Sequence, residues 1–120
     1  MATPESKVKT KVKDILERSG AYFFMPPMNG YGASGVPDIV ACLDGRFIGV
    51  ECKANGNKPT KLQIKNLEQI RDAGGMAFVV DETSIGLFAM NLSITPKGVP
   101  DIGVLYDYTS FIEPSNTVRK

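Results

Sequence analysis

The dipeptide Asp44-Gly45, placed between two apolar runs, limits what this chain can fold into more than any other feature. The two-residue hairpin turn that matches the twist of paired strands needs positive φ at both turn positions, which Asp-Gly supplies. We therefore predict an antiparallel hairpin made of a strand at 38–43 and a strand at 46–53.

The register of this hairpin brings three charged side chains together. If Leu43 pairs with Arg46, continued pairing sets Asp38 opposite Glu51, with Cβ atoms about 5 Å apart. Because side chains alternate along a strand, Lys53 falls on the same face. Opposed carboxylates destabilise a sheet, and a divalent cation that also binds a phosphodiester would remove the repulsion. The alternative is a solvated edge hairpin in which Lys53 screens the two carboxylates.

Composition limits the chemistry further. The chain has 120 residues, 42% of them hydrophobic and 22% charged, which is typical of one ordinary globular domain. It contains no histidine, which excludes a histidine general base, a histidine-containing zinc site and a Ser-His or Cys-His nucleophile. Carboxylates, lysine and a metal remain. We expect Cys42 and Cys52 to be buried strand residues on opposite faces of the hairpin, without a disulfide.

Charge and hydropathy give weaker signals about partners and location. The net charge of +1 is no signature of a nucleic-acid binder. The lysines that crowd the first helix are typical of a solvated face: Lys7, Lys9, Lys11 and Lys13. No apolar run is long enough to span a membrane and the N-terminus lacks the apolar stretch of a signal peptide, so we expect a cytoplasmic protein.

An N-terminal helix is predicted from its capping residues. Thr3 suits the N-cap, Pro4 the first helical position and Glu5 the positively polarised helix start. Gly20 is a stop signal. The apolar stripe consists of Val8, Val12, Ile15 and Leu16. A short strand at 21–25 follows, and then a loop rich in glycine and proline leads to Pro37-Asp38.

A second helix is predicted between the hairpin and another apolar run. Thr60-Lys61-Leu62-Gln63 has the pattern of a capping box, and Gly74-Gly75 ends the helix. The run at 76–80 then completes a crossover with parallel pairing. Gln63 lies at the start of the buried stripe, so it either caps Thr60 or faces the acidic cluster. We expect that one amide cannot serve both directions fully.

The rest of the chain is less informative. Thr83 is a candidate cap for a helix over 84–91, and 104–108 is a candidate strand. Gly98-Val99-Pro100-Asp101-Ile102 repeats Gly35-Val36-Pro37-Asp38-Ile39, but no Asp-Gly hairpin or E-x-K sequence follows it. We interpret the second copy as a turn into a strand, with Asp101 not catalytic.

The residues that stand out so far resemble a known family. In order and spacing, Glu5, Gly35-Val36-Pro37-Asp38, Glu51-Cys52-Lys53 and Gln63 resemble the PD-(D/E)xK nuclease superfamily, and within it the VRR-NUC branch of small stand-alone phage and bacterial domains. The resemblance covers about residues 5–80. It implies an α/β, restriction-endonuclease-like αβββαβ core with a mixed central sheet flanked by helices. We expect one nuclease domain over 1–120, with a core at about 4–81 and a C-terminal extension at 82–120.

The resemblance also implies a chemistry, that of a Mg²⁺- or Mn²⁺-dependent deoxyribonuclease. By this resemblance, Asp38 and Glu51 hold the metal with the Cys52 carbonyl, and Glu5 holds it through water. Lys53 serves the attacking water, and Gln63 orients Lys53 or the phosphate. Stand-alone members resemble Holliday junction resolvases and act as homodimers on branched DNA, and a phage-encoded one would act in the host cytoplasm.

The residues expected to contact the DNA lie in two loops and at the start of the second helix. The candidates are Tyr31, Ser34, Lys58 and Lys61. The leading hypothesis is thus an endonuclease that selects branched DNA such as four-way junctions or flaps. A second is a catalytically inactive nucleic-acid-binding module of the same fold. A third is a protein-interaction domain whose acidic face binds a basic partner.

Overall fold

The computed structural model describes residues 2–27 and 35–94. The elements follow one another as α1 (Pro4–Arg18), β1 (Tyr22–Phe24), β2 (Ile39–Leu43), β3 (Arg46–Cys52), α2 (Lys61–Asp72), β4 (Met76–Val80) and α3 (Ile85–Ile94). The first six have the predicted αβββαβ order. No helix in this part of the chain is long and apolar enough to cross a membrane.

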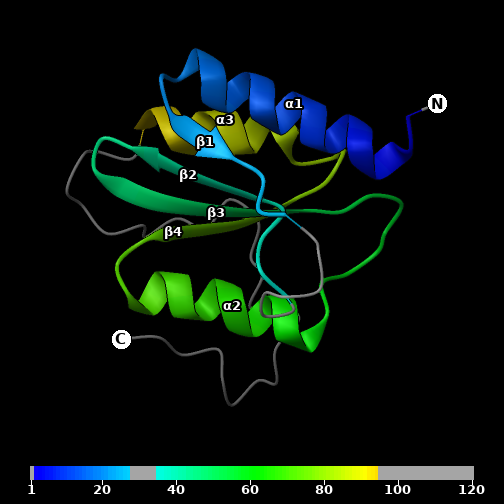
Figure 1. Cartoon of the computed structure of the whole chain (residues 1–120). Coiled ribbons are helices and arrows are strands. Elements are labelled where there is room, and N and C mark those ends of the chain that lie inside the picture. Colours follow the sequence, from blue (N-terminus) through cyan, green and yellow to red (C-terminus); the bar gives the residue numbers. More distant parts are fainter. Residues whose placement is uncertain (1, 28–34, 95–120) are drawn as a thin grey trace.

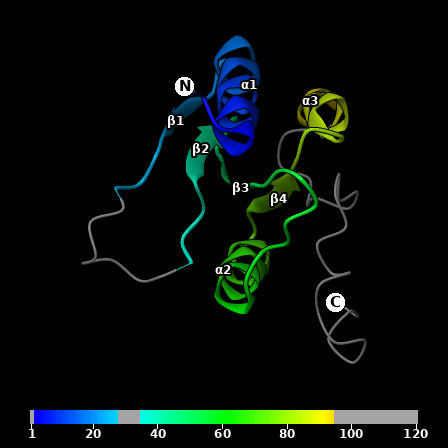
Figure 2. The ribbon, with the colours of Figure 1, turned by 90° about the vertical axis from the view of Figure 1, so that its right-hand side faces the viewer.

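One mixed sheet with the order β1-β2-β3-β4 forms the middle layer. The β1–β2 and β2–β3 pairs are antiparallel, whereas β3 and β4 are parallel and are connected through α2. Helices α1 and α3 lie on one face of the sheet and α2 lies on the other (Figures 1 and 2). The predicted crossover after the hairpin is therefore confirmed.

The hairpin turn has the expected backbone conformation. Asp44 and Gly45 have φ values of 53° and 81°, the positive values that the two-residue turn requires. Leu43 pairs with Arg46, and the same register continues to the pair Ile39–Val50. Turn chemistry that is local in the sequence thus determines which residues lie beside each other at the far end of the hairpin.

The larger part of the core lies between the sheet and the two helices on its α1 side. Val8, Val12 and Leu16 of α1 are buried there, and Ile15 is partly buried, so the predicted stripe is confirmed. From β4 and α3, the rings of Phe78 and Phe88 meet edge to face with centroids 5.2 Å apart. Part of the expected C-terminal extension therefore packs into the core.

The opposite face is covered by α2, which comes close to the sheet at Gly49. A Cβ atom added there would lie 2.5 Å from Cδ1 of Ile70. Glycine at this position of β3 lets the helix pack against the backbone of the strand. Buried Ile64 and Leu67 complete the helix side of this contact. Helix α2 is in this way packed directly against the backbone of β3.

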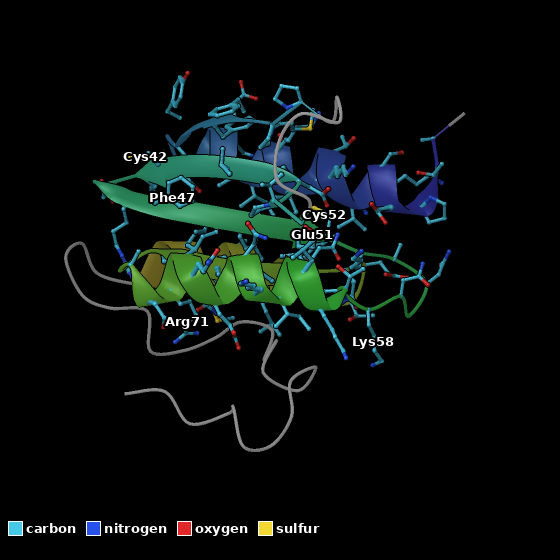
Figure 3. All side chains as sticks on the ribbon, turned by 60° about the horizontal axis from the view of Figure 1, so that its bottom comes forward. Cys42, Phe47, Glu51, Cys52, Lys58 and Arg71 are labelled. Atoms are coloured by element: carbon cyan, nitrogen blue, oxygen red, sulfur yellow. The ribbon has the colours of Figure 1, made fainter. Side chains whose placement is uncertain are left out.

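Two expectations are corrected by the structure. Cys52 is buried, but Cys42 is exposed, because it lies on the α2 face of the sheet where α2 packs on β3 and β4 rather than on β2. Figure 3 shows Cys42 at the turn end of the hairpin and Cys52 at the other end. Thr83 is not the cap of the next helix, because α3 begins after Ser84, whose carbonyl accepts the Phe88 amide. The Thr83 hydroxyl instead donates to Asp81. Asp101 and the strand expected at 104–108 lie outside the described ranges.

Candidate active site

Asp38 stands one residue before β2, where the ladder with β3 ends. Its Oδ2 atom accepts a hydrogen bond of 2.8 Å from the Cys52 amide, so the side chain replaces the next backbone bond of the ladder. The side chain is 14% exposed. The carboxylate is therefore fixed against β3 beside Glu51, as the hairpin register predicts.

The segment before Asp38 is anchored on α2 through Gly35. This residue has a φ of 84°, and a Cβ atom there would lie 2.8 Å from the backbone C and O atoms of Leu62. Both the positive φ and the close approach require glycine. Gly35 therefore determines how the chain enters β2, and with it where Asp38 lies relative to α2.

Glu51 is a buried carboxylate with one satisfied and one unsatisfied oxygen. It lies in β3 between β2 and β4 and is 2% exposed. Its Oε2 accepts a 2.7 Å hydrogen bond from Nε2 of Gln63, and Nζ of Lys53 lies 3.7 Å away. Oε1 has no hydrogen-bond partner among the described residues. A buried acceptor without a partner is costly, so this atom points to a ligand.

The surroundings of Glu51 change its acidity. Burial, followed by the negative charge of Asp38, raises the pKa of Glu51 to about 8 from its ordinary value of 4.5, and the Lys53 ammonium opposes that rise. A positive charge added beside Oε1 would lower the pKa and favour the ionised form. Burial also raises the pKa of the neighbouring Cys52 thiol, which lies on the other face of the strand.

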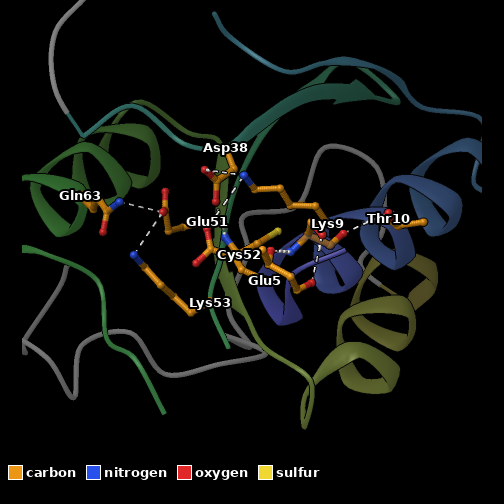
Figure 4. Close-up of polar contacts among 10 residues, drawn as sticks. Glu5, Lys9, Thr10, Asp38, Glu51, Cys52, Lys53 and Gln63 are labelled. Carbon is orange, nitrogen blue, oxygen red and sulfur yellow. Dashed lines mark hydrogen bonds and ion pairs between the residues drawn. The ribbon is translucent and has the colours of Figure 1, made fainter. Parts of the chain in front are cut away.

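Gln63 serves both of the roles between which the sequence left a choice. Its Oε1 accepts the Thr60 amide at 2.8 Å and its backbone amide donates to the Thr60 hydroxyl, which completes the capping box. Its Nε2 donates to Glu51. The expectation that one amide could not do both was wrong, because its oxygen accepts from Thr60 while its nitrogen donates to Glu51. Figure 4 shows the contact with Glu51.

On the other side of the site, α1 contributes Glu5 and also Lys9, which was predicted to lie on a solvated face. Nζ of Lys9 lies 3.7 Å from Oδ1 of Asp38 and 3.9 Å from Oε2 of Glu5. A Glu-x-x-x-Lys spacing in α1 was the available signal, but it predicts only a surface pair. The contact with Asp38 depends on how α1 packs on the sheet.

The acidic cluster offers two carboxylates and one backbone carbonyl as donors to a divalent cation. No group of three or more His, Cys, Asp or Glu side chains within 2–27 and 35–94 is arranged to hold a metal. Magnesium takes one or two carboxylates and fills its remaining positions with water, carbonyl and phosphate oxygens. In a strand, the amide and carbonyl of one residue point to the same side, so the Cys52 carbonyl faces the Asp38 side, as its amide does. Asp38, Glu51 and that carbonyl therefore fit such an ion.

The surroundings of the cluster include a surface cavity of about 350 Å³ beside the start of α1. Glu5 and Lys9 line it from the helix, and Asn55 and Asn57 line it from the loop after β3. The two lysines expected to contact DNA are exposed near the start of α2: Lys58 and Lys61. The other two candidates lie outside the described ranges: Tyr31 and Ser34.

Two comparisons with known proteins point to a nuclease. No family model matches the chain. The chain is 36% identical to the "Putative nuclease p44" of Acyrthosiphon pisum secondary endosymbiont phage 1. The match extends over 83 residues and covers 68% of this chain and 85% of the phage protein. A solved structure described as a VRR_NUC domain superposes with a TM-score of 0.59 at 28% identity, and the match covers 71% of this chain and 92% of that structure.

Proposed function

Because the chain belongs to the VRR-NUC family of nucleases, we propose that it is a Mg²⁺- or Mn²⁺-dependent endonuclease that hydrolyses DNA phosphodiester bonds. The observation that carries the proposal is Oε1 of Glu51, a buried carboxylate oxygen without a hydrogen-bond partner among the described residues. With Asp38 fixed beside it and Lys53 on the same strand end, a divalent cation accounts for this arrangement.

Each residue of the site has a role in this proposal. Asp38, Glu51 and the Cys52 carbonyl would hold the cation. When bound, it would offset the negative charge that develops on the phosphate and make a neighbouring water more acidic. Gln63 fixes one oxygen of Glu51 through its 2.7 Å hydrogen bond and leaves the other for the cation. The carboxylate that would hold the cation is thus already oriented.

Lys53 is the residue that we assign to the attacking water. Its side chain is 13% exposed, and its ammonium is held 3.7 Å from Oε2 of Glu51. An ammonium at that place can orient the water, accept its proton after losing its own, or stabilise the pentavalent phosphate. Glu5, at the edge of the cavity, would hold the cation through an intervening water.

We further propose that the substrate is branched DNA, such as a four-way junction or a flap, and that the active form is a homodimer. Two sites related by a two-fold axis would match the two-fold arrangement of strands at a junction, which one chain of 13.0 kDa does not provide. Exposed Lys61, with Lys58 in the loop before it, supports contact with phosphates next to the acidic cluster. Tyr31 and Ser34 are further proposed contacts. Size-exclusion chromatography with light scattering tests the dimer, and a monomer at working concentration would contradict it.

Cleavage of a panel of DNA structures tests the enzyme and its substrate together. Labelled four-way junction, flap and linear duplex are incubated with Mg²⁺, with Mn²⁺ and with excess chelator. Asp38→Asn keeps an oxygen for the Cys52 amide but removes the charge, so we expect cleavage to fall by at least about a hundredfold. Asp44→Asn is the matched control, because the turn accepts asparagine equally well.

The outcomes separate the competing functions. Full cleavage by Asp38→Asn or in chelator overturns the proposed chemistry. Metal-independent DNA binding with no cleavage of any substrate supports the inactive binding module instead. Equal cleavage of linear duplex and of branched DNA leaves the nuclease in place but overturns the proposed selectivity. A magnesium-dependent rise in the unfolding temperature, present in Asp44→Asn and lost in Asp38→Asn, checks cation binding without DNA.

A further inference from the structure

The ammonium of Lys9 lies between two carboxylates that belong to different parts of the fold. Its Nζ is 3.7 Å from Oδ1 of Asp38 and 3.9 Å from Oε2 of Glu5 (Figure 4). The Glu5–Lys9 spacing within α1 accounts for the second contact alone. The first contact joins α1 to Asp38, a proposed metal ligand, so Lys9 is not only a charge on the surface of the helix.

Both oxygens of Asp38 are thereby engaged by donors of this chain. Oδ2 accepts the Cys52 amide, and Oδ1 faces Lys9. The amide contact at 2.8 Å is a hydrogen bond, whereas the ammonium contact at 3.7 Å is a looser attraction between charges. A divalent cation carries twice the charge and approaches carboxylate oxygens to about 2 Å, so it would displace the ammonium and not the amide.

Lys9 also has room to move without repacking of the core. Its side chain is 32% exposed and lines the surface cavity of about 350 Å³ together with Ser6, Asn55 and Asn57. Glu5 stands at the same cavity and would keep an attraction for the displaced ammonium. The movement needs only a change of side-chain rotamers on one face of α1.

From this geometry we propose that Lys9 is a positioning residue, the internal counter-ion of Asp38 that a divalent cation displaces when it binds. This inference rests on the proposed metal-dependent function. It adds that the Lys9 ammonium competes with the cation for Asp38. In the metal-free protein Lys9 offsets the repulsion between Asp38 and its acidic neighbours. In the metal-bound protein its positive charge opposes the cation, so Lys9 raises the Mg²⁺ concentration at which the site fills.

Metal affinity measured without DNA is the decisive readout. Lys9→Met keeps the length of the side chain and removes its charge, so Mn²⁺ and Mg²⁺ should bind about tenfold more tightly in calorimetric titration. Lys11→Met removes the same charge from an exposed position of α1 and should leave the dissociation constant within about twofold. Lys9→Arg keeps the charge, so its affinity for the metal should stay close to that of the unsubstituted chain.

A merely structural role for Lys9 predicts the opposite result, because a disturbed site binds metal more weakly. Unchanged or weaker binding by Lys9→Met, with binding retained by Lys11→Met, overturns the proposal. If Lys9→Met does not fold, Lys9→Gln is titrated in its place and judged by the same criterion.

The failure of this inference is separable from the failure of the proposed function. A double-mutant cycle of Lys9→Met and Asp38→Asn, measured by urea unfolding in chelator, reports their coupling without any metal. We expect Lys9→Met to destabilise the chain less when Asp38 is already asparagine. Zero coupling overturns the role of Lys9 alone. Absence of cation binding by every variant overturns the metal-dependent function, and with it the displacement step.

Discussion

Gln63 Nε2 donates a hydrogen bond of 2.7 Å to Oε2 of Glu51 and so connects the first turn of α2 to the buried carboxylate of β3. The other half of the same amide completes the cap of the helix with Thr60. The start of α2 and the orientation of the proposed metal ligand therefore depend on one side chain.

Replacement of that amide by a carboxylate should separate its two roles. Gln63→Glu retains an oxygen for the Thr60 amide but sets a second negative charge against Glu51. We expect a loss of about 1–3 kcal/mol of stability at pH 8 in chelator, and at least about tenfold weaker Mg²⁺ binding. Gln69→Glu makes the same change at an exposed position of α2 and should alter stability by only a few tenths of a kcal/mol. Equal effects of the two variants would contradict the role of the 2.7 Å hydrogen bond.

Stability of the metal-free protein should fall as the pH rises. Since the pKa of Glu51 is raised to about 8 in the fold from an ordinary 4.5, the folded state binds a proton that the unfolded state has already lost in this window. The stabilisation is complete below pH 4.5 and is lost as the pH approaches 8, with a total on the order of a few kcal/mol. Urea unfolding in chelator at several pH values measures the slope.

Two glutamate variants isolate this slope from the titration of other groups. Glu51→Gln removes the titrating carboxyl and should flatten the dependence between pH 4.5 and 8. Glu17→Gln, at an exposed position of α1, should keep the slope of the unsubstituted chain. A slope that persists in Glu51→Gln would show that another group is responsible. Saturating Mg²⁺ should also flatten the slope, because the cation favours the ionised carboxylate.

Substitution of Gly35 should lower the stability of the fold. A Cβ atom on a residue with φ of 84° would meet the Leu62 backbone at 2.8 Å, so Gly35→Ala should cost at least about 2 kcal/mol. Gly86→Ala is the control, because this helical glycine has open space around it and alanine favours a helix by up to about 1 kcal/mol. Chemical denaturation of both variants checks the opposite signs. A Gly35→Ala variant as stable as the original chain would contradict the close packing.

Two lysines near the site should affect different kinetic constants. Lys53→Met removes the ammonium beside Glu51, so kcat should fall by about a hundredfold or more. Lys61→Met removes an exposed charge in the first turn of α2 and should raise KM and reduce the salt dependence of DNA binding. Steady-state kinetics on a junction at two salt concentrations distinguishes them. A similar change of kcat in both variants would contradict the assignment of Lys53.

The parts of the site that the sequence predicts are those set by local chemistry. Positive φ at Asp44 and Gly45 determines the hairpin register, and that register brings Asp38 to Glu51. The capping box likewise identifies Thr60 and Gln63 as the start of a helix. Each of these inferences needs only residues a few positions apart or one turn type.

The parts that the sequence does not predict depend on packing between distant elements. Lys9 reaches Asp38 only because the stripe of α1 buries against the sheet, and no local pattern reports that distance. The burial that raises the pKa of Glu51 comes from pairing with β4 and from coverage by α2. Cys42 is exposed because α2 covers β3 and β4, an offset that alternation along β2 does not reveal.

The contrast between the two cysteines gives the chain a native point for labelling. Cys42 is exposed on the hairpin, while Cys52 is buried and its thiol has a raised pKa that keeps it in the unreactive form. The chain has no other cysteine, so a maleimide fluorophore or spin label should attach at one position. That position lies on the same strand pair as Asp38, at the other end. Distances from this probe to labelled DNA can therefore report binding at the site without a single substitution in the protein.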